Sequence, residues 1–255
     1  MNPSGRPKNT STSILVKLAH ASAPFLSTFL LVHLSAPLLA NLGGSNLSSS
    51  VMVSARILLD TIVNTGTNLQ LFGREYYQTP FGEKYLLLTP FVVHVASGIA
   101  RRLAAPASKQ PVRKLTSPLS LSAYTALAIF VPIHIFTHRL APADASAPIF
   151  AVGPAELDYE FVKTGLHLFP WHSWVLYTGL VVSVLVHAVE GVNVLRTTWL
   201  GAARLSSRAR KLIAGAVAVP VMIGLWTLSR EPLMALSSTV ERYSSCFTRL
   251  WVYRV

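Results

Sequence analysis

Long apolar segments alternate with shorter polar ones along the whole chain. Five apolar segments approach the roughly 20 residues that a helix needs to cross the hydrocarbon core of a bilayer. These segments cover residues 13–41, 85–102, 119–140, 172–195 and 211–229. The pattern therefore predicts an all-α integral membrane protein with five transmembrane helices.

Three further segments mix apolar and charged residues and are too polar to cross a membrane. They are residues 51–77, residues 153–169 and the tail from Pro232 to Val255. Such a mixture is typical of amphipathic helices that lie in the membrane interface. We expect these segments to be surface elements at the ends of the spans.

Composition supports the membrane prediction and indicates which class of binding partner the basic residues fit. Hydrophobic residues make up 51% of the chain, charged residues only 13%, and the mean hydropathy is +0.47. The net charge is +12, but the basic residues fall mostly between the apolar segments, so an anionic membrane surface fits them better than nucleic acid. Cys246 is the single cysteine, which excludes an internal disulfide or a four-cysteine metal site within one chain.

The distribution of charge predicts the topology. Lys and Arg resist translocation, and they cluster before the first span, after the second and after the fourth. Most of the acidic residues lie in the opposite loops: Asp60, Glu75, Glu83, Asp144, Glu156, Asp158 and Glu160. We therefore expect a cytosolic N-terminus and a C-terminal tail on the other side of the membrane.

The first four spans form an internal repeat. The stretch "FLLVHLSAPL" at 29–38 resembles "FVPIHIFTHRL" at 130–140, and "VVHVASGI" at 92–99 resembles "LVHAVEGV" at 185–192. Two copies of a two-span unit account for both pairs. The predicted organisation is a basic N-terminus at 1–12, a first repeat at 13–103, a basic linker at 104–118, a second repeat at 119–200, and a fifth span with an amphipathic tail at 201–255.

One histidine lies in each repeated span: His33, His94, His134 and His187. Ionisable groups inside a membrane are costly and usually face the bundle interior, where they pair or bind a ligand. At about 1.5 Å per residue, His94 and His187 lie roughly 10 to 14 Å from the basic face, and the other two roughly 22 to 24 Å. Each level thus holds one histidine from each repeat, as two axial ligands of a haem require.

Nearby residues fit the same interpretation. Gly98 and Gly191 each follow a histidine by four residues, so each leaves room for a porphyrin edge one helical turn away. Arg101, Arg102 and Arg196 lie where they could pair with haem propionates. The sequence therefore predicts one or two haem b groups in a haem-b-like four-helix bundle. The alternative is that these histidines hydrogen-bond neighbouring helices and contribute only packing.

Other chemistry has little support in the sequence. The chain contains no phosphate-binding loop, dinucleotide-binding fingerprint, nucleophile elbow or zinc-protease motif, so we expect no hydrolase or transferase activity. A transmembrane electron carrier, or the cytochrome b subunit of an oxidoreductase, would use the same histidines. A channel or transporter is less favoured because acids within the spans are scarce.

Two resemblances follow from these motifs. The pattern H-x-x-x-G-I-x-R from His94 to Arg101 is similar to the haem-ligand helix of the succinate dehydrogenase and fumarate reductase cytochrome b subunits. A more extensive resemblance is to the fungal mitochondrial outer-membrane adaptors that complement loss of Mdm10. It rests on "SAPFLSTFLLVHLSAPLLANLGG", on "REYYQTPFGEKYLLLTPFVVHVASGIARRL" and on the duplicated histidine spans.

The second resemblance implies a multi-pass outer-membrane protein that acts in mitochondrial lipid homeostasis. It also implies recruitment of a bridge-like lipid-transfer protein at contact sites. In that family recruitment uses a Pro-x-Pro motif in the cytosolic N-terminal region, and none of the 16 prolines here is followed by another two residues later. The resemblance therefore predicts the membrane and lipid roles more directly than the contact with the partner.

Overall fold

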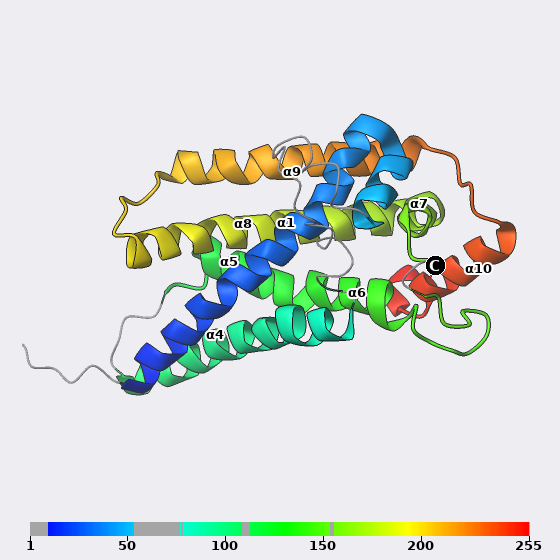
Figure 1. The fold of residues 1–255 in the computed structure, drawn as a ribbon. Coiled ribbons are helices and arrows are strands. Elements are labelled where there is room, and N and C mark those ends of the chain that lie inside the picture. The colour runs from blue at the N-terminus through cyan, green and yellow to red at the C-terminus, as the bar shows by residue number, and fades with distance from the viewer. Residues whose placement is uncertain (1–9, 54–76, 78, 109–112, 154–155, 255) are drawn as a thin grey trace, which may run out of the picture. The chain divides into compact units, whose positions relative to one another are not determined.

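The computed structural model describes residues 10–53, 77, 79–108, 113–153 and 156–254, and this part of the chain contains helices and no strands (Figure 1). The predicted N-terminal segment lies almost wholly outside the described residues, and so does most of the predicted interfacial helix at 51–77. Among the described residues, five helical stretches are long and apolar enough to cross a membrane. They are Ser13–Ser49, Gly82–Ala104, Pro118–Leu140, Pro170–Trp199 and Ser207–Arg230. The predicted all-α class and all five predicted spans are confirmed.

The chain divides into two compact units. The first contains the chain up to His33 together with Asn68–Lys114, and the second contains Leu34–Thr67 and Leu115–Val255. The long helix α1, Thr10–Val53, belongs to both units, because the division falls after His33.

Within the first unit, the start of α1 lies beside the second span. That span begins as a π-helix, η1 (Gly82–Leu88), and continues as α4 (Thr89–Ser108). Thr89 N–H donates to Lys84 O, five residues back, and so joins the wide turn to the regular helix. This unit carries His33 on α1 and His94 on α4.

The third span, in the second unit, widens twice from an α-helix into a π-turn. It runs through α5 (Pro118–Thr125), the π-turn η2 (Ala126–Phe130), α6 (Val131–Ile135) and the π-turn η3 (Phe136–Leu140). Ser117 caps its start by accepting from Ser120 N–H. Pro132 has no N–H to donate, and the preceding Val131 N–H reaches back five residues to Ala126 O. The wide turns therefore flank the short segment that carries His134.

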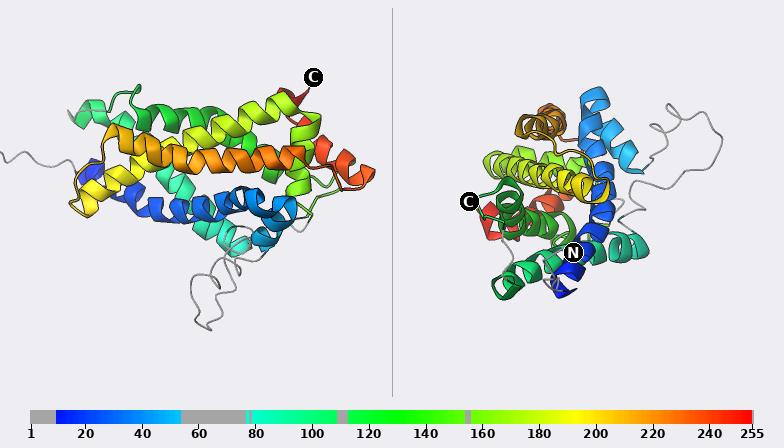
Figure 2. Two further views of the ribbon diagram at one scale, coloured as in Figure 1. Left: turned by 90° about the horizontal axis from the view of Figure 1, so that it is seen from above. Right: turned by 90° about the vertical axis from the view of Figure 1, so that its left-hand side faces the viewer.

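The fourth and fifth spans are α8 (Pro170–Trp199) and α9 (Ser207–Arg230), which lie side by side, with α8 also packed on the third span (Figure 2). Glycine permits two close approaches here. A Cβ on Gly179 would lie 2.1 Å from the Phe130 ring, and a Cβ on Gly224 would lie 1.8 Å from Pro37 O. Larger residues at Gly179 and Gly224 would push these neighbouring elements apart.

Shorter elements close one end of the second unit. The predicted amphipathic segments at 153–169 and 232–255 form α7 (Tyr159–Leu168), α10 (Ser237–Thr248) and the 3₁₀ turn η4 (Trp251–Tyr253). Asp158 caps α7 by accepting from Glu160 N–H at 2.8 Å. The buried rings of Phe161 and Phe247 stack with centroids 4.7 Å apart, so α7 and α10 share one aromatic core.

An ionic latch, formed by Lys163, Glu160 and Glu231, joins three parts of this unit. Lys163 is only 1% exposed, and its Nζ lies 2.5 Å from Glu160 Oε1 and 3.4 Å from Glu231 Oε2. Glu231 Oε1 also accepts from Ser45 N–H at 2.9 Å, where α1 breaks at Gly44 with a φ of +60°. The latch therefore fixes the second half of α1 against α7 and the end of α9.

Candidate functional site

The geometry around His94 is contained within the first unit. Its Nδ1 atom lies 3.0 Å from Ala19 O and 3.2 Å from Ser22 Oγ, so α4 is tied to the first span. Ser22 Oγ itself donates to Ala19 O at 3.0 Å. A carbonyl oxygen can only accept, so the proton of a neutral His94 sits on Nδ1 and the lone pair on Nε2.

The same arrangement recurs at His187 in the second unit. Its Nδ1 atom lies 3.3 Å from Leu119 O, near the start of the third span. Ser122, three residues after that acceptor, donates to Pro118 O at 2.6 Å and to Leu119 O at 3.4 Å. Each repeat therefore fixes its histidine tautomer through a carbonyl that also accepts from a serine hydroxyl.

This hydrogen bond matters for metal chemistry. Histidines that bind metals usually donate their other ring N–H to a carbonyl or carboxylate, which orients the ring and raises its basicity. In the neutral form of both His94 and His187 the proton lies on Nδ1, which is the tautomer that metal-binding histidines use when they coordinate through Nε2. Their predicted pairing on one iron stays a prediction.

The glycines one turn beyond these histidines are not needed for close packing. A Cβ built on Gly98 or on Gly191 would meet no described atom within 4 Å. Gly179 and Gly224 behave in the opposite way, since their missing side chains admit a neighbouring ring or carbonyl. Gly98 is an exposed position and Gly191 a half-buried one, so the predicted room for a porphyrin edge beside them stays a prediction.

His33 has aromatic surroundings within the first unit. Its ring stacks on Phe29 with centroids 5.2 Å apart and meets the edge of Tyr77 at 5.8 Å. Phe29 and Tyr77 also contact each other at 5.1 Å. These contacts fix the imidazole among rings of the first span and Tyr77.

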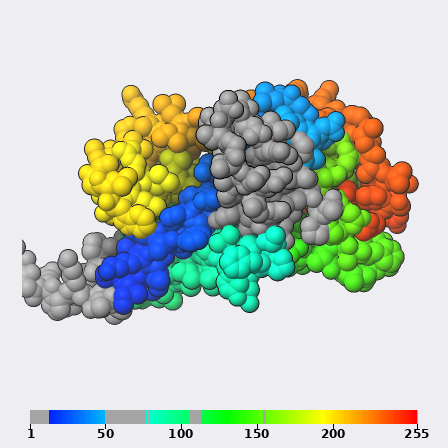
Figure 3. Space-filling view, in the orientation of Figure 1, coloured from blue at the N-terminus to red at the C-terminus, as the bar shows by residue number. Residues whose placement is uncertain are grey.

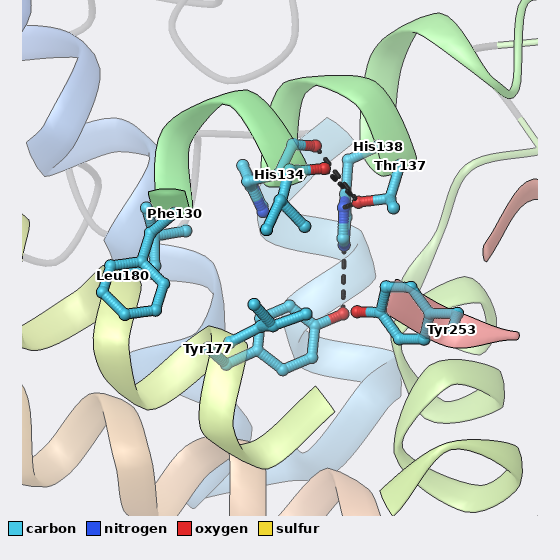
Figure 4. A pocket seen from close by; sticks show the side chains of 9 residues that line it. Phe130, His134, Thr137, His138, Tyr177, Leu180 and Tyr253 are labelled. Atoms are coloured by element: carbon cyan, nitrogen blue, oxygen red, sulfur yellow. Dashed lines mark hydrogen bonds between the residues drawn. The ribbon is translucent and has the colours of Figure 1, made fainter. Parts of the chain in front are cut away.

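His134, the corresponding histidine of the second repeat, has a different neighbour. It stacks on His138 with ring centroids 4.2 Å apart, and both rings project toward Tyr177 on α8 (Figure 4). His138 Nδ1 lies 2.7 Å from Thr137 Oγ1, and His138 Nε2 lies 3.0 Å from Tyr177 OH. Because Thr137 Oγ1 donates to Ile133 O, a neutral His138 donates from Nδ1 and accepts the Tyr177 hydroxyl at Nε2.

A small pocket lies between these side chains. It is lined by His134, His138, Thr137, Tyr177 and Tyr253 together with apolar residues, and its volume of about 10 Å³ admits about one water molecule. Burial raises the pKa of Tyr253 to about 12, so its hydroxyl stays protonated and can donate into this region. Sequence reasoning gave His138 no role, although its four-residue spacing from His134 was visible in the chain.

The predicted propionate partners lie near helix ends. Arg102 Nη1 donates to Arg113 O at 3.2 Å, and Arg196 Nη2 donates to Ala203 O at 3.5 Å, while Arg101 is exposed. Among the described residues, no three His, Cys, Asp or Glu side chains gather as a metal site. A bis-histidine haem site uses only two protein ligands, so this observation leaves the haem prediction untested.

Sequence reasoning also missed an ion pair inside the fourth span. Glu190 lies next to Gly191 and is 9% exposed, and its Oε1 atom accepts from Arg210 Nε at 2.8 Å. The pair joins α8 to the start of α9. Its carboxylate was visible in the sequence, but its partner is 20 residues away and is brought close only by the turn between the helices.

Comparison with known proteins adds one finding. Residues 129–239 match the family model described as the transmembrane domain of MDM10-complementing protein 1. This match confirms the resemblance to the Mdm10-complementing family. The matched region runs from the π-turn before His134 through His187 to α10. No curated protein and no solved structure matches the chain significantly, and the local similarity to succinate dehydrogenase stays a prediction.

Proposed function

We propose that this chain is a mitochondrial outer-membrane protein of the Mdm10-complementing family that maintains mitochondrial lipid homeostasis. The family match over residues 129–239 carries the proposal, because it covers the second half of the third span and all of the fourth and fifth spans of a multi-span membrane protein. In this proposal the helical bundle is a membrane anchor with a cytosolic N-terminus, and it recruits a bridge-like lipid-transfer protein. No enzymatic activity is required.

The decisive experiment is complementation. Overproducing the full chain in fungal cells that lack Mdm10 should restore growth and the mitochondrial phospholipid composition, measured by lipid mass spectrometry. Gly224→Val is a matched loss-of-fold control, because its side chain would clash with Pro37 O. Normal accumulation in the outer membrane without any rescue would refute the lipid role. Co-purification of the lipid-transfer protein would test the adaptor role separately.

The hydrogen bonds of the second-span histidine in each repeat favour a further candidate function, the binding of haem b. His94 and His187 each donate Nδ1–H to a carbonyl of a neighbouring span, which presents Nε2 as the ligand atom. His33 and His134 are the proposed ligands of a second haem. Such haems would supply one-electron chemistry when bound. The protein contributes ring orientation, tautomer selection and exclusion of water.

A transmembrane electron carrier, or the cytochrome b subunit of an oxidoreductase, is the alternative function that this haem site would serve. Purified protein expressed with ample haem should show a Soret band and the sharp reduced bands of six-coordinate haem b. Reduction of that haem by a quinol would support the redox function over a structural cofactor. A colourless preparation would refute both the ligand assignment and the redox alternative.

A further inference from the structure

The turn between α8 and α9 presents an exposed cationic surface. Arg204, Arg208 and Lys211 are exposed there, and no acidic residue occurs between Gly191 and Arg230. Arg208 and Lys211 lie three residues apart on the first turns of α9 and so share one face. Figure 3 shows the turn (yellow) on the surface of the molecule.

The turn is fixed by polar groups from the interior of α8. Asn193 is only 1% exposed, and its side-chain oxygen accepts from Leu205 N–H at 2.9 Å. Arg210 bonds Glu190 and also donates through Nη1 to Leu205 O. The charge of Arg210 is thus matched by Glu190. The other three cations, Arg204, Arg208 and Lys211, are exposed beside a turn that these hydrogen bonds fix.

Large apolar side chains accompany these cations. Trp199 is 55% exposed, Leu200 76% and Leu212 73%. They lie where the fourth span ends and the fifth begins, the level at which tryptophan and arginine anchor helices at a membrane interface. A soluble acidic partner would match the cations alone, whereas an anionic amphiphile matches both the cations and the apolar rim.

We propose that the α8–α9 turn is a binding site for anionic phospholipid. Arg204, Arg208 and Lys211 contact the headgroup phosphate, and Trp199 and Leu200 border the upper acyl chains. The inference deepens the proposed lipid function by naming a lipid class, and its biological meaning rests on that function. Binding is measured on purified protein, so failure here and failure of complementation are separate results.

The test titrates full-length protein in mild detergent with fluorescent phosphatidylglycerol or phosphatidylcholine and follows fluorescence anisotropy. Each cation near an anionic surface contributes about a fivefold factor in affinity. The double variant Arg204→Gln/Arg208→Gln should therefore bind phosphatidylglycerol about 30-fold more weakly and leave phosphatidylcholine binding unchanged. The matched control is Arg230→Gln/Arg254→Gln, which removes the same charge outside the turn and should behave like the natural chain.

A second variant tests the fixed geometry. Asn193→Leu keeps every cation but releases Leu205 N–H, and it should weaken phosphatidylglycerol binding by about fivefold. Equal weakening by the Arg230→Gln/Arg254→Gln control would overturn the site, because net charge alone would then explain binding. Unchanged binding by Asn193→Leu would overturn the role of the fixed turn. A soluble acidic peptide that competes as strongly as the lipid would reassign the surface to a protein partner.

Discussion

In the first repeat His94 lies 3.0 Å from Ala19 O, and in the second repeat His187 lies 3.3 Å from Leu119 O. The corresponding first-span histidines differ far more. His33 packs on Phe29 and Tyr77, whereas His134 stacks on His138. The two repeats thus share the hydrogen bond of the second-span histidine and differ in the ring contacts of the first-span histidine. The carbonyl hydrogen bond that His94 and His187 share makes them the better candidates for the proposed ligand role.

The largest expected effect is on haem content. His94→Ala or His187→Ala should each remove at least one haem equivalent, because each variant takes away one of the two proposed axial ligands. The measurement is the Soret absorbance per protein, with His167→Ala as the matched control. If both variants kept their haem, the shared carbonyl bond would be a packing feature only.

The latch offers a way to weaken the second unit by itself. Lys163→Met leaves Glu160 and Glu231 facing each other without their buried cation and should cost about 3 kcal/mol of stability. Thermal unfolding in detergent measures this loss, and absorbance at each temperature reports haem release. The conservative Glu160→Gln variant keeps most backbone contacts and should lose less.

Acid should act on the same latch. Burial alone raises the pKa of Glu160 and Glu231, but hydrogen bonds and the Lys163 charge hold both pKa values below the ordinary 4.5. A carboxylate with a lowered pKa stabilises the fold above its unfolded-state value and loses that contribution as the pH falls through the folded value. Stability should therefore decline below pH 4.5, and Lys163→Met should show a flatter decline. A steeper decline in that variant would contradict the latch.

A smaller effect on stability is expected at His138, the neighbour of His134 in the second repeat. His138→Phe leaves the buried Tyr177 hydroxyl without its acceptor and should cost about 1 to 3 kcal/mol. The double variant with Tyr177→Phe should recover part of this cost, since both partners are then apolar. Thermal unfolding of the natural chain, the two single variants and the double variant gives the coupling energy. A coupling near zero would mean that the hydrogen bond does not stabilise the protein.

The smallest expected effect is on haem retention, and it distinguishes the site of His94 from the site of His187. Ser22 Oγ lies 3.2 Å from His94 Nδ1, whereas Ser122 makes its shorter bond to Pro118 O rather than to the acceptor of His187. Ser22→Ala should therefore weaken haem retention by about tenfold at most, and Ser122→Ala by less. Competition with apomyoglobin measures retention. Equal effects of both variants would show that the two serines act alike.

The sequence predicted some features of the site because they are local. Helical spacing places Gly98 one turn beyond His94 and Gly191 one turn beyond His187, whatever the rest of the chain does. The partners of these residues were not predictable, since Ala19 O is 75 positions from His94 and Leu119 O is 68 positions from His187. No sequence pattern singled out His138, because its hydrogen-bond partner, Tyr177, comes from another span.

The sequence by itself determined the five spans, the helical class and the repeated histidine motif, because apolar length and periodicity are properties of consecutive residues. Only the tertiary structure decided which carbonyl fixes each histidine tautomer. It also decided which glycines admit a neighbour and how Lys163, Glu160 and Glu231 form one latch. These features depend on directional contacts between segments far apart in the chain. A hydrogen bond or a van der Waals clash is set by atomic positions to within a few tenths of an ångström, which no sequence pattern specifies.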